Sequence, residues 1–195
     1  GGWYHINYDN MVFVTGGGSH YVKERIYKAS GIFRKYSFND SKKSWDMNKN
    51  LWKNTGRKLM YFDGSGTCTI LYDQASNILY RYISSSKSYK RVSNVIDKLN
   101  GSRYYFYDAN GNRRTSSGWK KVNGSTAYYV CDGGYVTSRY TDQKGTKKVY
   151  NFDYSKNTWV QKKNMWKTVY SSRYYFGSNG VATISYNNNT QKAYK

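Results

Sequence analysis

Aromatic residues recur along the chain in short runs, and each run is followed by a polar turn that contains glycine. The clearest runs are MYFDGSG at residues 60–66, YYFYDANG at 104–111 and YYFGSNG at 174–180. An aromatic pair, a short turn with Gly and then apolar or Thr residues are typical of a β-hairpin. The pattern therefore predicts an all-β protein of tandem stacked β-hairpins, with a repeat or solenoid-like organisation.

One segment, residues 88–100, breaks this rhythm. Its sequence SYKRVSNVIDKLN has no aromatic pair and no turn glycine. Apolar residues at helical spacing predict one short helix near 90–99, or else a linker. These apolar residues are Val92, Val95, Ile96 and Leu99.

The second half of the chain repeats the first. Residues 34–81 align without a gap with residues 148–195, and 16 of the 48 positions are identical. The Gly-Trp pair at residue 2 matches the pair at residue 118 if two residues are inserted near 16–19. We therefore expect two copies: the first spans 1–115, with 82–115 as a connecting segment, and the second, truncated copy spans 116–195.

Charge and aromatic content narrow the classes of function. The chain of 195 residues carries a net charge of +21, and 24 of its residues are Tyr. A balance this basic predicts attraction to a polyanion, which leaves nucleic acid, an anionic membrane surface or a cell-wall polymer such as teichoic acid. Lys outnumbers Arg, and Lys acts as a point charge for phosphate, which favours a phosphate-rich polymer over base reading.

Other compositional signals are weak or absent. Proline is absent, so Gly, Asn, Asp and Ser must form the turns. No run of about 18 apolar residues predicts a membrane span, and no signal peptide is evident. Cys68 and Cys131 lack any metal-ligand spacing; they either remain as buried free thiols, which we favour, or pair under oxidising conditions.

The stretch GSRYYFYDANGN followed by SSGWKKVNGSTAYYV, within residues 101–130, resembles a known family. It is similar to the aromatic cell-wall-binding repeats of Gram-positive surface proteins. Related repeats occur in choline-binding modules, in the glucan-binding domains of glucansucrases and in clostridial toxins. The resemblance implies an extracellular, wall-associated module that binds cell-wall polysaccharide, teichoic acid or glucan. Choline itself is disfavoured, because a surface this basic repels a cation.

The aromatic rings have two possible roles, core and ligand contact. Phe62, Tyr105, Phe106 and Phe176 are expected in the core, because stacked hairpins bury rings between neighbours and Phe has no polar edge. The Trp residues occur as three copied pairs, which fits a duplicated binding site or a duplicated core equally well. The predicted ligand contacts are Trp3, Trp45, Trp52, Lys53, Tyr104, Tyr107, Trp119, Lys120, Trp159, Trp166 and Lys167.

The lysines beside these tryptophans also have two interpretations. Lys53, Lys120 and Lys167 each follow a Trp directly in the sequence. Each of them either contacts phosphate beside a stacking ring or forms a solvated flank, and for any single Lys the flank is favoured.

Catalysis finds no support in the pattern. His5 and His20 have no His counterpart in the second copy, and the aligned acids are not repeated. No carboxylate pair stands out at the separation that a glycosidase needs. We expect no enzyme activity, no cofactor and no metal site.

The sequence thus predicts a non-catalytic module that anchors a secreted protein to the Gram-positive cell surface. Trp and Tyr would stack on sugar rings, and Lys would attract anionic wall polymer. The alternative is a surface-layer or adhesin domain that self-associates on the wall. Nucleic-acid binding is less favoured, because the local signatures of common nucleic-acid modules are missing.

Overall fold

The computed structural model describes residues 1–18 and 20–195, and most of them lie in short β-strands. The only helical element in this part of the chain is a single 3-10 turn, η1 (Ser84–Ser86). No helix among the described residues has the length and hydrophobicity needed to cross a membrane. The chain forms two compact units, Gly1–Val92 and Ser93–Lys195.

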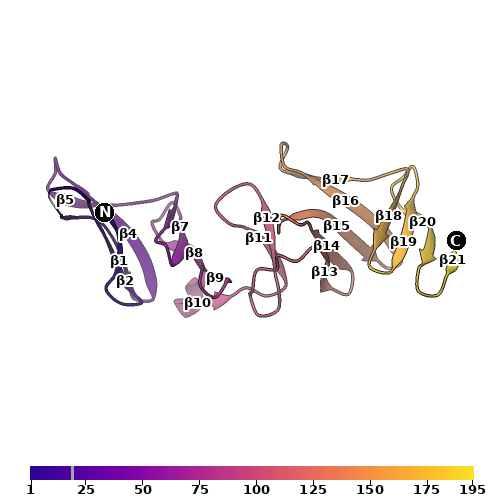
Figure 1. The fold of residues 1–195 in the computed structure, drawn as a ribbon, viewed down its shortest axis with the longest axis horizontal. Coiled ribbons are helices and arrows are strands. Elements are labelled where there is room, and N and C mark those ends of the chain that lie inside the picture. Colours follow the sequence, from indigo (N-terminus) through magenta and orange to yellow (C-terminus); the bar gives the residue numbers. More distant parts are fainter. Residues whose placement is uncertain (19) are drawn as a thin grey trace. The chain divides into compact units, whose positions relative to one another are not determined.

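The first unit consists of two five-stranded antiparallel sheets. In each sheet every strand pairs with its neighbours in the sequence, so the chain runs as a meander without crossovers (Figure 1). The strands of the first sheet are β1 (Gly2–His5), β2 (Asn10–Val14), β3 (Val22–Ala29), β4 (Ile32–Asn39) and β5 (Ser44–Met47). Those of the second sheet are β6 (Leu51–Asn54), β7 (Lys58–Phe62), β8 (Cys68–Asp73), β9 (Ile78–Ile83) and β10 (Ser88–Arg91).

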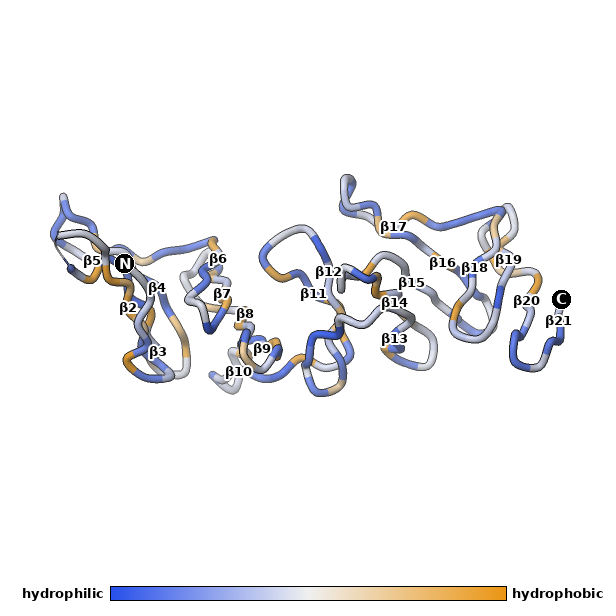
Figure 2. Tube along the Cα trace, viewed as in Figure 1, coloured by the Kyte–Doolittle hydropathy of each residue, from blue (hydrophilic) through white to orange (hydrophobic). Residues whose placement is uncertain are grey.

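The second unit has three antiparallel sheets, again built from consecutive strands. Along the trace, short hydrophobic stretches alternate with hydrophilic turns (Figure 2), as expected for hairpins that bury one face. The predicted all-β class with tandem hairpins is therefore confirmed. The strands are β11 (Val95–Lys98) and β12 (Tyr104–Tyr107) in one sheet, β13 (Gly118–Asn123), β14 (Thr126–Val130), β15 (Val136–Gln143), β16 (Thr146–Asp153) and β17 (Thr158–Gln161) in the next, and β18 (Met165–Val169), β19 (Ser172–Phe176), β20 (Ala182–Asn187) and β21 (Lys192–Tyr194) in the last.

Equivalent strands recur at the spacing found in the sequence. The strands β3, β4 and β5 have the same bounds as β15, β16 and β17 after a shift of 114, since 22 + 114 = 136 and 47 + 114 = 161. The strands β1 and β2 start 116 residues before β13 and β14. The two extra residues of the first copy therefore lie in the turn between β2 and β3, of which Ser19 falls outside the described residues. The compact units divide after Val92, whereas the predicted copy boundary at 115/116 stays a prediction.

Four turns that follow a strand share one backbone geometry. In each of them the N–H of the first residue donates to the carbonyl oxygen of the fifth residue. The carbonyl oxygen of the first residue accepts a hydrogen bond from the N–H of the fourth. The fourth residue is a buried glycine with φ between 74° and 79°, a region that residues with a Cβ avoid. At Gly66 an added Cβ would lie 2.3 Å from the Met47 sulfur, so the position requires glycine. The four turns begin at Asp63, Asp108, Cys131 and Gly177.

The residues predicted to form the core are largely buried. Phe62 and Phe176 are fully buried and Phe106 is 3% exposed, while Tyr105 is only half-buried. The two phenylalanines Phe62 and Phe176 end equivalent strands, β7 and β19, directly before a turn. In the first unit Phe62 packs in a cluster with apolar residues of both sheets, including Met11 and Ile26. Rings that end a hairpin strand thus join neighbouring hairpins.

The predicted helix near 90–99 is wrong. The structure places β10 and β11 there, and Asn94 between them has a left-handed φ of 47°. The Asn94 N–H donates to the carbonyl of Asp108, so the backbone is satisfied by the neighbouring hairpin and not by a helical turn. Asn50 and Asn164 make the equivalent turn at the start of other sheets. Residues 82–115 therefore use the same connection as the two copies, which the sequence comparison missed.

Candidate functional site

Each of the six tryptophans lies directly across a strand pair from another aromatic ring. Directly opposed side chains touch on one face of a sheet, and such pairs contribute about 0.2–1 kcal/mol each. The ring centroids of the six pairs are between 5.0 and 5.7 Å apart. Equivalent tryptophans thus form equivalent cross-strand aromatic pairs in both copies. The pairs are Trp3–Phe13, Trp119–Tyr129, Trp45–Phe38, Trp159–Phe152, Trp52–Tyr61 and Trp166–Tyr175.

The predicted Trp contacts differ in how much ring surface they expose. Trp166 is 41% exposed, and the Arg173 guanidinium lies 5.0 Å from its ring centroid. Its counterpart Trp52 is half-buried, as are Trp3, Trp45 and Trp159. Trp166 is therefore the tryptophan with the most open face.

Trp119 is engaged in packing. Its indole N–H donates to the carbonyl oxygen of Thr168 at 2.9 Å. Its ring also contacts Tyr140 and Tyr170, with centroids 6.3 and 6.5 Å apart. This tryptophan therefore ties the sheet of β13–β17 to the end of β18.

Aromatic rings in the first sheet surround one of the protein's own cations. The Arg25 guanidinium lies 4.3 Å from the ring centroid of Trp45, 5.3 Å from that of Tyr36 and 5.5 Å from that of Tyr27. A cation within about 6 Å of several ring faces is held by their quadrupoles. A soluble cation would have to displace Arg25 to use these rings.

The second copy repeats the same arrangement. Arg139, which follows Arg25 by 114 residues, lies 4.4 Å from the Tyr150 ring and 5.0 Å from the Trp159 ring. The predicted contacts Trp45 and Trp159 therefore face an internal arginine in both copies.

The lysines beside the tryptophans are less free than the sequence suggested. The Lys53 ammonium lies 2.5 Å from a Glu24 carboxylate oxygen and 5.2 Å from the Trp3 ring centroid. Lys167, its counterpart, lies 5.6 Å from the Tyr129 ring. Lys120 is half-buried and donates to the Ser116 hydroxyl at 3.1 Å. None of the three is a simple solvated flank.

Glu24 is shared between two lysines. The buried Lys35 ammonium donates to Oε1 of the Glu24 carboxylate at 2.7 Å, whereas Lys53 contacts Oε2. Burial raises the pKa of Glu24, but the hydrogen bonds from Lys35 and Lys53 outweigh it and hold that pKa below its ordinary value. Burial lowers the pKa of Lys35, opposed by its bond to Glu24. Lys53 therefore serves an internal ion network.

The two tyrosines predicted as contacts separate in the structure. Tyr104 is half-buried, packs edge-on against Phe152 at 5.0 Å and lies 4.9 Å from the Lys98 ammonium. Tyr107 is fully buried, so it cannot touch a ligand directly and its assignment as a contact is corrected. It ends β12 as Phe62 ends β7, directly before a turn, and it fills the same core position.

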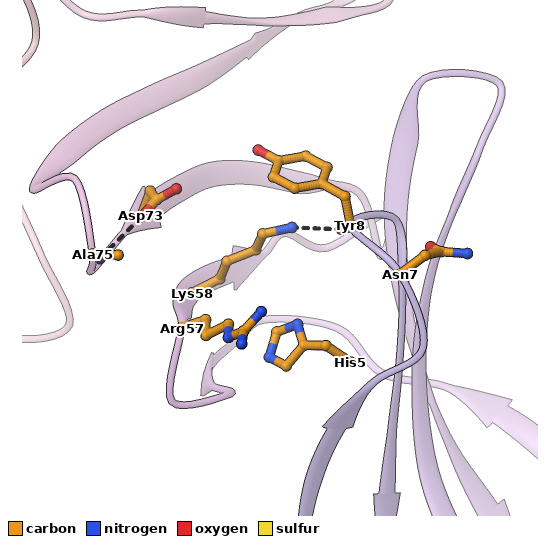
Figure 3. A pocket seen from close by; sticks show the side chains of 7 residues that line it. All are labelled: His5, Asn7, Tyr8, Arg57, Lys58, Asp73 and Ala75. Atoms are coloured by element: carbon orange, nitrogen blue, oxygen red, sulfur yellow. Dashed lines mark hydrogen bonds between the residues drawn. The ribbon is translucent and has the colours of Figure 1, made fainter.

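An open pocket of about 550 Å³ lies in the first unit, between the β1–β2 loop and the β6–β7 turn. Lys58 donates to the Tyr8 carbonyl oxygen at 2.6 Å, and its ammonium lies 3.5 Å from the Tyr8 ring centroid. The side chains of His5 and Arg57 lie beside one another below Lys58 (Figure 3). The lining residues are His5, Asn7, Tyr8, Arg57, Lys58, Asp73 and Ala75.

The electrostatics of this pocket are dominated by lysine and arginine. Burial lowers the pKa of the Lys58 ammonium, although Asp9 and Asp73 act in the opposite direction. Asp73 caps its own turn, because its Oδ1 accepts the N–H groups of Ala75 and Ser76 at 3.0 and 3.1 Å. The pocket therefore offers one aromatic ring beside the held Lys58 ammonium and the exposed Arg57 guanidinium.

A second pocket of about 270 Å³ in the first unit shares Tyr8 with the first one. Its lining combines apolar and aromatic side chains with two lysines, Lys28 and Lys87. Hydroxyl and ammonium groups beside aromatic rings are suited to a sugar or polyol. The lining residues are Tyr8, Lys28, Gly31, Phe33, Leu71, Tyr80, Lys87, Ser88 and Tyr89.

Two pockets of the second copy lie at places that partly correspond to these. A pocket of about 140 Å³ includes Lys121 and Asn123, which are His5 and Asn7 shifted by 116. Another of about 170 Å³ includes Gly145 and Tyr194, which are Gly31 and Tyr80 shifted by 114. None of the predicted contacts lines any of these four pockets. The loop residues Tyr8 and Tyr170, which line three of the four pockets, were not among the predicted contacts because they stand outside the aromatic pairs.

The described residues include the side-chain types that ligate metals and two cysteines that could react as thiols. They contain no group of three His, Cys, Asp or Glu side chains that could hold a metal ion. Both cysteines are free, and burial raises the pKa of Cys68 to about 12, which keeps its thiol protonated and unreactive.

Comparisons with known proteins give weak similarities. No protein-family model matches the chain, and no curated protein matches it. Alternansucrase in complex with isomaltononaose is 15% identical, with a TM-score of 0.25 over 99% of this chain and 16% of that chain. CbpJ from Streptococcus pneumoniae TIGR4 is 18% identical, with a TM-score of 0.26 over 96% and 56%.

A third similar structure is choline binding protein F from Streptococcus pneumoniae in the presence of a peptidoglycan analogue. It is 18% identical, with a TM-score of 0.26 over 90% of this chain and 65% of that chain. The chain thus spans less than two thirds of the length of each of these three proteins. Every TM-score is below 0.5, so the ligand of this chain is inferred from its own residues.

Proposed function

We propose that this chain is a non-catalytic module that binds cell-wall or extracellular glycan and holds a secreted protein at a Gram-positive cell surface. The observation that carries the proposal is that two pockets lie at partly corresponding places in both copies, although their lining residues differ. A repeated site on a repetitive polymer gains avidity, because the second contact becomes intramolecular.

The pocket chemistry fits a sugar or polyol. Tyr8 is 62% exposed and lines both pockets of the first unit. An exposed tyrosine presents a flat apolar face for C–H groups and a hydroxyl for hydrogen bonds. Asn7 and Ser88 supply further hydrogen-bonding groups beside it. Aromatic stacking and hydroxyl recognition therefore meet in the same place.

The charge fits an anionic wall polymer such as teichoic acid. A net charge of +21 raises the local concentration of a polyanion and speeds encounter. Salt screens this part of binding but leaves stacking in the pockets intact. We expect attachment that weakens with salt without disappearing.

Choline does not fit as the main ligand. The best ring clusters for a cation are those around Arg25 and Arg139, and these arginines occupy them. Free choline should therefore fail to release the protein from the wall.

Self-association on the wall is the second candidate, and one observation favours it. The edge strand β1 and the following loop expose Tyr4, Ile6 and Tyr8 by 60–67%. Exposed apolar residues at a sheet edge are suited to pairing with another copy. A surface-layer or adhesin role would follow if this edge, and not the pockets, carried binding.

Two single variants separate these functions. Tyr8→Ala removes a ring from both pockets, whereas Tyr4→Ala removes an equally exposed ring from the same hairpin outside them. Binding to purified Gram-positive cell wall is measured before and after teichoic acid is stripped, at low and high salt. We expect Tyr8→Ala to weaken binding about tenfold, the factor that about 1.4 kcal/mol gives, and Tyr4→Ala to have little effect.

Other results would change the assignment. Equal losses in both variants, together with concentration-dependent sedimentation, would favour self-association. Binding that is absent from wall but tight to oligonucleotides, with a steep dependence on salt, would favour nucleic acid. Loss of binding after stripping would identify teichoic acid as the ligand, and persistence at high salt would identify a neutral glycan.

A further inference from the structure

The residues that line the pocket beside the β1–β2 loop carry an excess of positive charge. Arg57 and Lys58 are consecutive at the β6–β7 turn, and Asp73 is the only carboxylate among the lining residues. The imidazole of His5 lies next to Arg57 (Figure 3) and contacts the Thr55 carbonyl at 3.4 Å. A group that enters this pocket therefore meets more positive than negative charge.

Lys58 is part of the pocket's framework. It is 4% exposed, and its ammonium is held against the Tyr8 ring and carbonyl oxygen. A cation so placed both fixes the β1–β2 loop and supplies a positive charge that does not move away into solvent. Lys58 shares this low exposure with Lys35, but Lys35 is paired with Glu24, whereas Lys58 lines the pocket.

Arg57 is the cation free to bind a ligand. Its backbone carbonyl is fixed by the N–H of Gln74 at 2.9 Å, but its side chain is exposed. Among the described residues no carboxylate forms an ion pair with its guanidinium. A planar guanidinium can bind two oxygens of one phosphate through parallel N–H bonds, a geometry that the point charge of a lysine ammonium does not offer.

The second copy lacks this chemistry at the same place. Arg57 and Lys58 correspond to Ser171 and Ser172 after a shift of 114, and Tyr8 corresponds to Gly124 after a shift of 116. The equivalent pocket shrinks to about 140 Å³ and keeps a single cation, Lys121. The cationic pocket is therefore a specialised feature of the first copy and not a by-product of the repeat.

We propose that this first-copy pocket binds the phosphate group of a polyol-phosphate or sugar-phosphate unit. The Arg57 guanidinium holds the phosphate oxygens, Lys58 supplies a second fixed charge, and the Tyr8 ring covers the adjoining polyol or sugar carbons. This assignment rests on the proposed function, since it takes the ligand to be a unit of a phosphate-bearing wall polymer.

The test is a titration of the full chain with a short poly(glycerol phosphate) oligomer, followed by NMR shifts and calorimetry. The variant Arg57→Ser introduces the residue of the second copy. Arg91→Ser removes the same charge from an exposed position outside the pocket and serves as the matched control. We expect Arg57→Ser to weaken binding about tenfold, as loss of a charge-assisted hydrogen bond does, and Arg91→Ser to weaken it less than about twofold.

Inorganic phosphate and glycerol serve as separate probes. Weaker binding of phosphate than of the oligomer, with shifts at Tyr8 only for the oligomer, supports recognition of the whole unit. Equal losses for Arg57→Ser and Arg91→Ser would overturn the proposal, because net charge alone would explain binding. Wall binding by the unchanged protein, with an oligomer affinity that Arg57→Ser leaves unaltered, would refute this pocket and leave the proposed function standing.

Discussion

The sheet of β1–β5 and the sheet of β13–β17 have the same strands but different interiors. In the first, the Lys35 ammonium is buried and donates to Glu24 at 2.7 Å, to Asn48 at 2.8 Å and to Ser37 at 3.1 Å. All three of its protons are thus used. In the second, the equivalents of Glu24 and Lys35 are Ser138 and Val149, both buried.

The difference shows which features the fold depends on. An ion network in one sheet and a small uncharged interior in its equivalent support the same strands, so the sheet requires neither. The features that both copies keep are the opposed aromatic pairs and the turn glycines. The rings and turns therefore specify the architecture, and the interior of the sheet is left free to vary.

The largest expected loss of stability tests the buried rings that the two copies share. Phe62→Ala and Phe176→Ala each remove a fully buried ring at the end of an equivalent strand. Each should lower the free energy of unfolding by about 3–5 kcal/mol, and the two losses should agree within about 1 kcal/mol. Urea denaturation of the full chain measures both. A loss in one copy alone would show that the copies do not share this requirement.

A smaller loss of stability tests the sheet interiors, which differ between the two copies. Glu24→Gln leaves the buried Lys35 without its counter-charge and should cost about 3 kcal/mol, at the low end for a buried pair because Glu24 keeps some exposure. Ser138→Ala, the matched change in the second copy, removes only a neutral hydrogen bond to Asn151 and should cost about 1 kcal/mol.

The double variant Glu24→Ser with Lys35→Val gives the first sheet the interior of the second. We expect it to recover most of the stability that Glu24→Gln loses, because replacing a whole buried pair is far less costly than breaking it. If the double variant were as unstable as Glu24→Gln, the packing around Lys35, and not its charge, would be the important feature.

The smallest effect is a difference in acid sensitivity. The pKa of Glu24 is lowered in the folded state, so its contribution to stability is complete above the ordinary glutamate pKa of about 4.3. That contribution is lost as the pH falls through the folded pKa, whereas Ser138 does not titrate. Amide hydrogen exchange between pH 7 and 3 should show β3 and β4 losing protection before β15 and β16.

Glu24→Ser provides the control for this last experiment. It should remove the difference between the two sheets, even though the first sheet starts from a lower stability. An unchanged difference in the variant would assign the acid sensitivity to other carboxylates, such as Asp63, whose pKa is also lowered by its turn hydrogen bonds.

The sequence alone predicts part of the fold of this protein. The hairpins, the turn glycines and the duplication are local or repeated signals, because a turn needs only its own residues to form. The burial of Phe62, Phe106 and Phe176 follows as well, since a ring without a polar edge beside a turn has no better place than the core.

The tertiary structure decided what lies beside each ring. Tyr104 and Tyr107 look alike in the sequence, yet only Tyr107 is fully buried, because the position before the turn faces the neighbouring hairpin. Lys53 reads as a flank of Trp52, but it pairs with Glu24 across two sheets. The pockets around Tyr8 combine loops that are about 50 residues apart. Such neighbours depend on how the sheets pack against one another, and a local sequence pattern does not determine that packing.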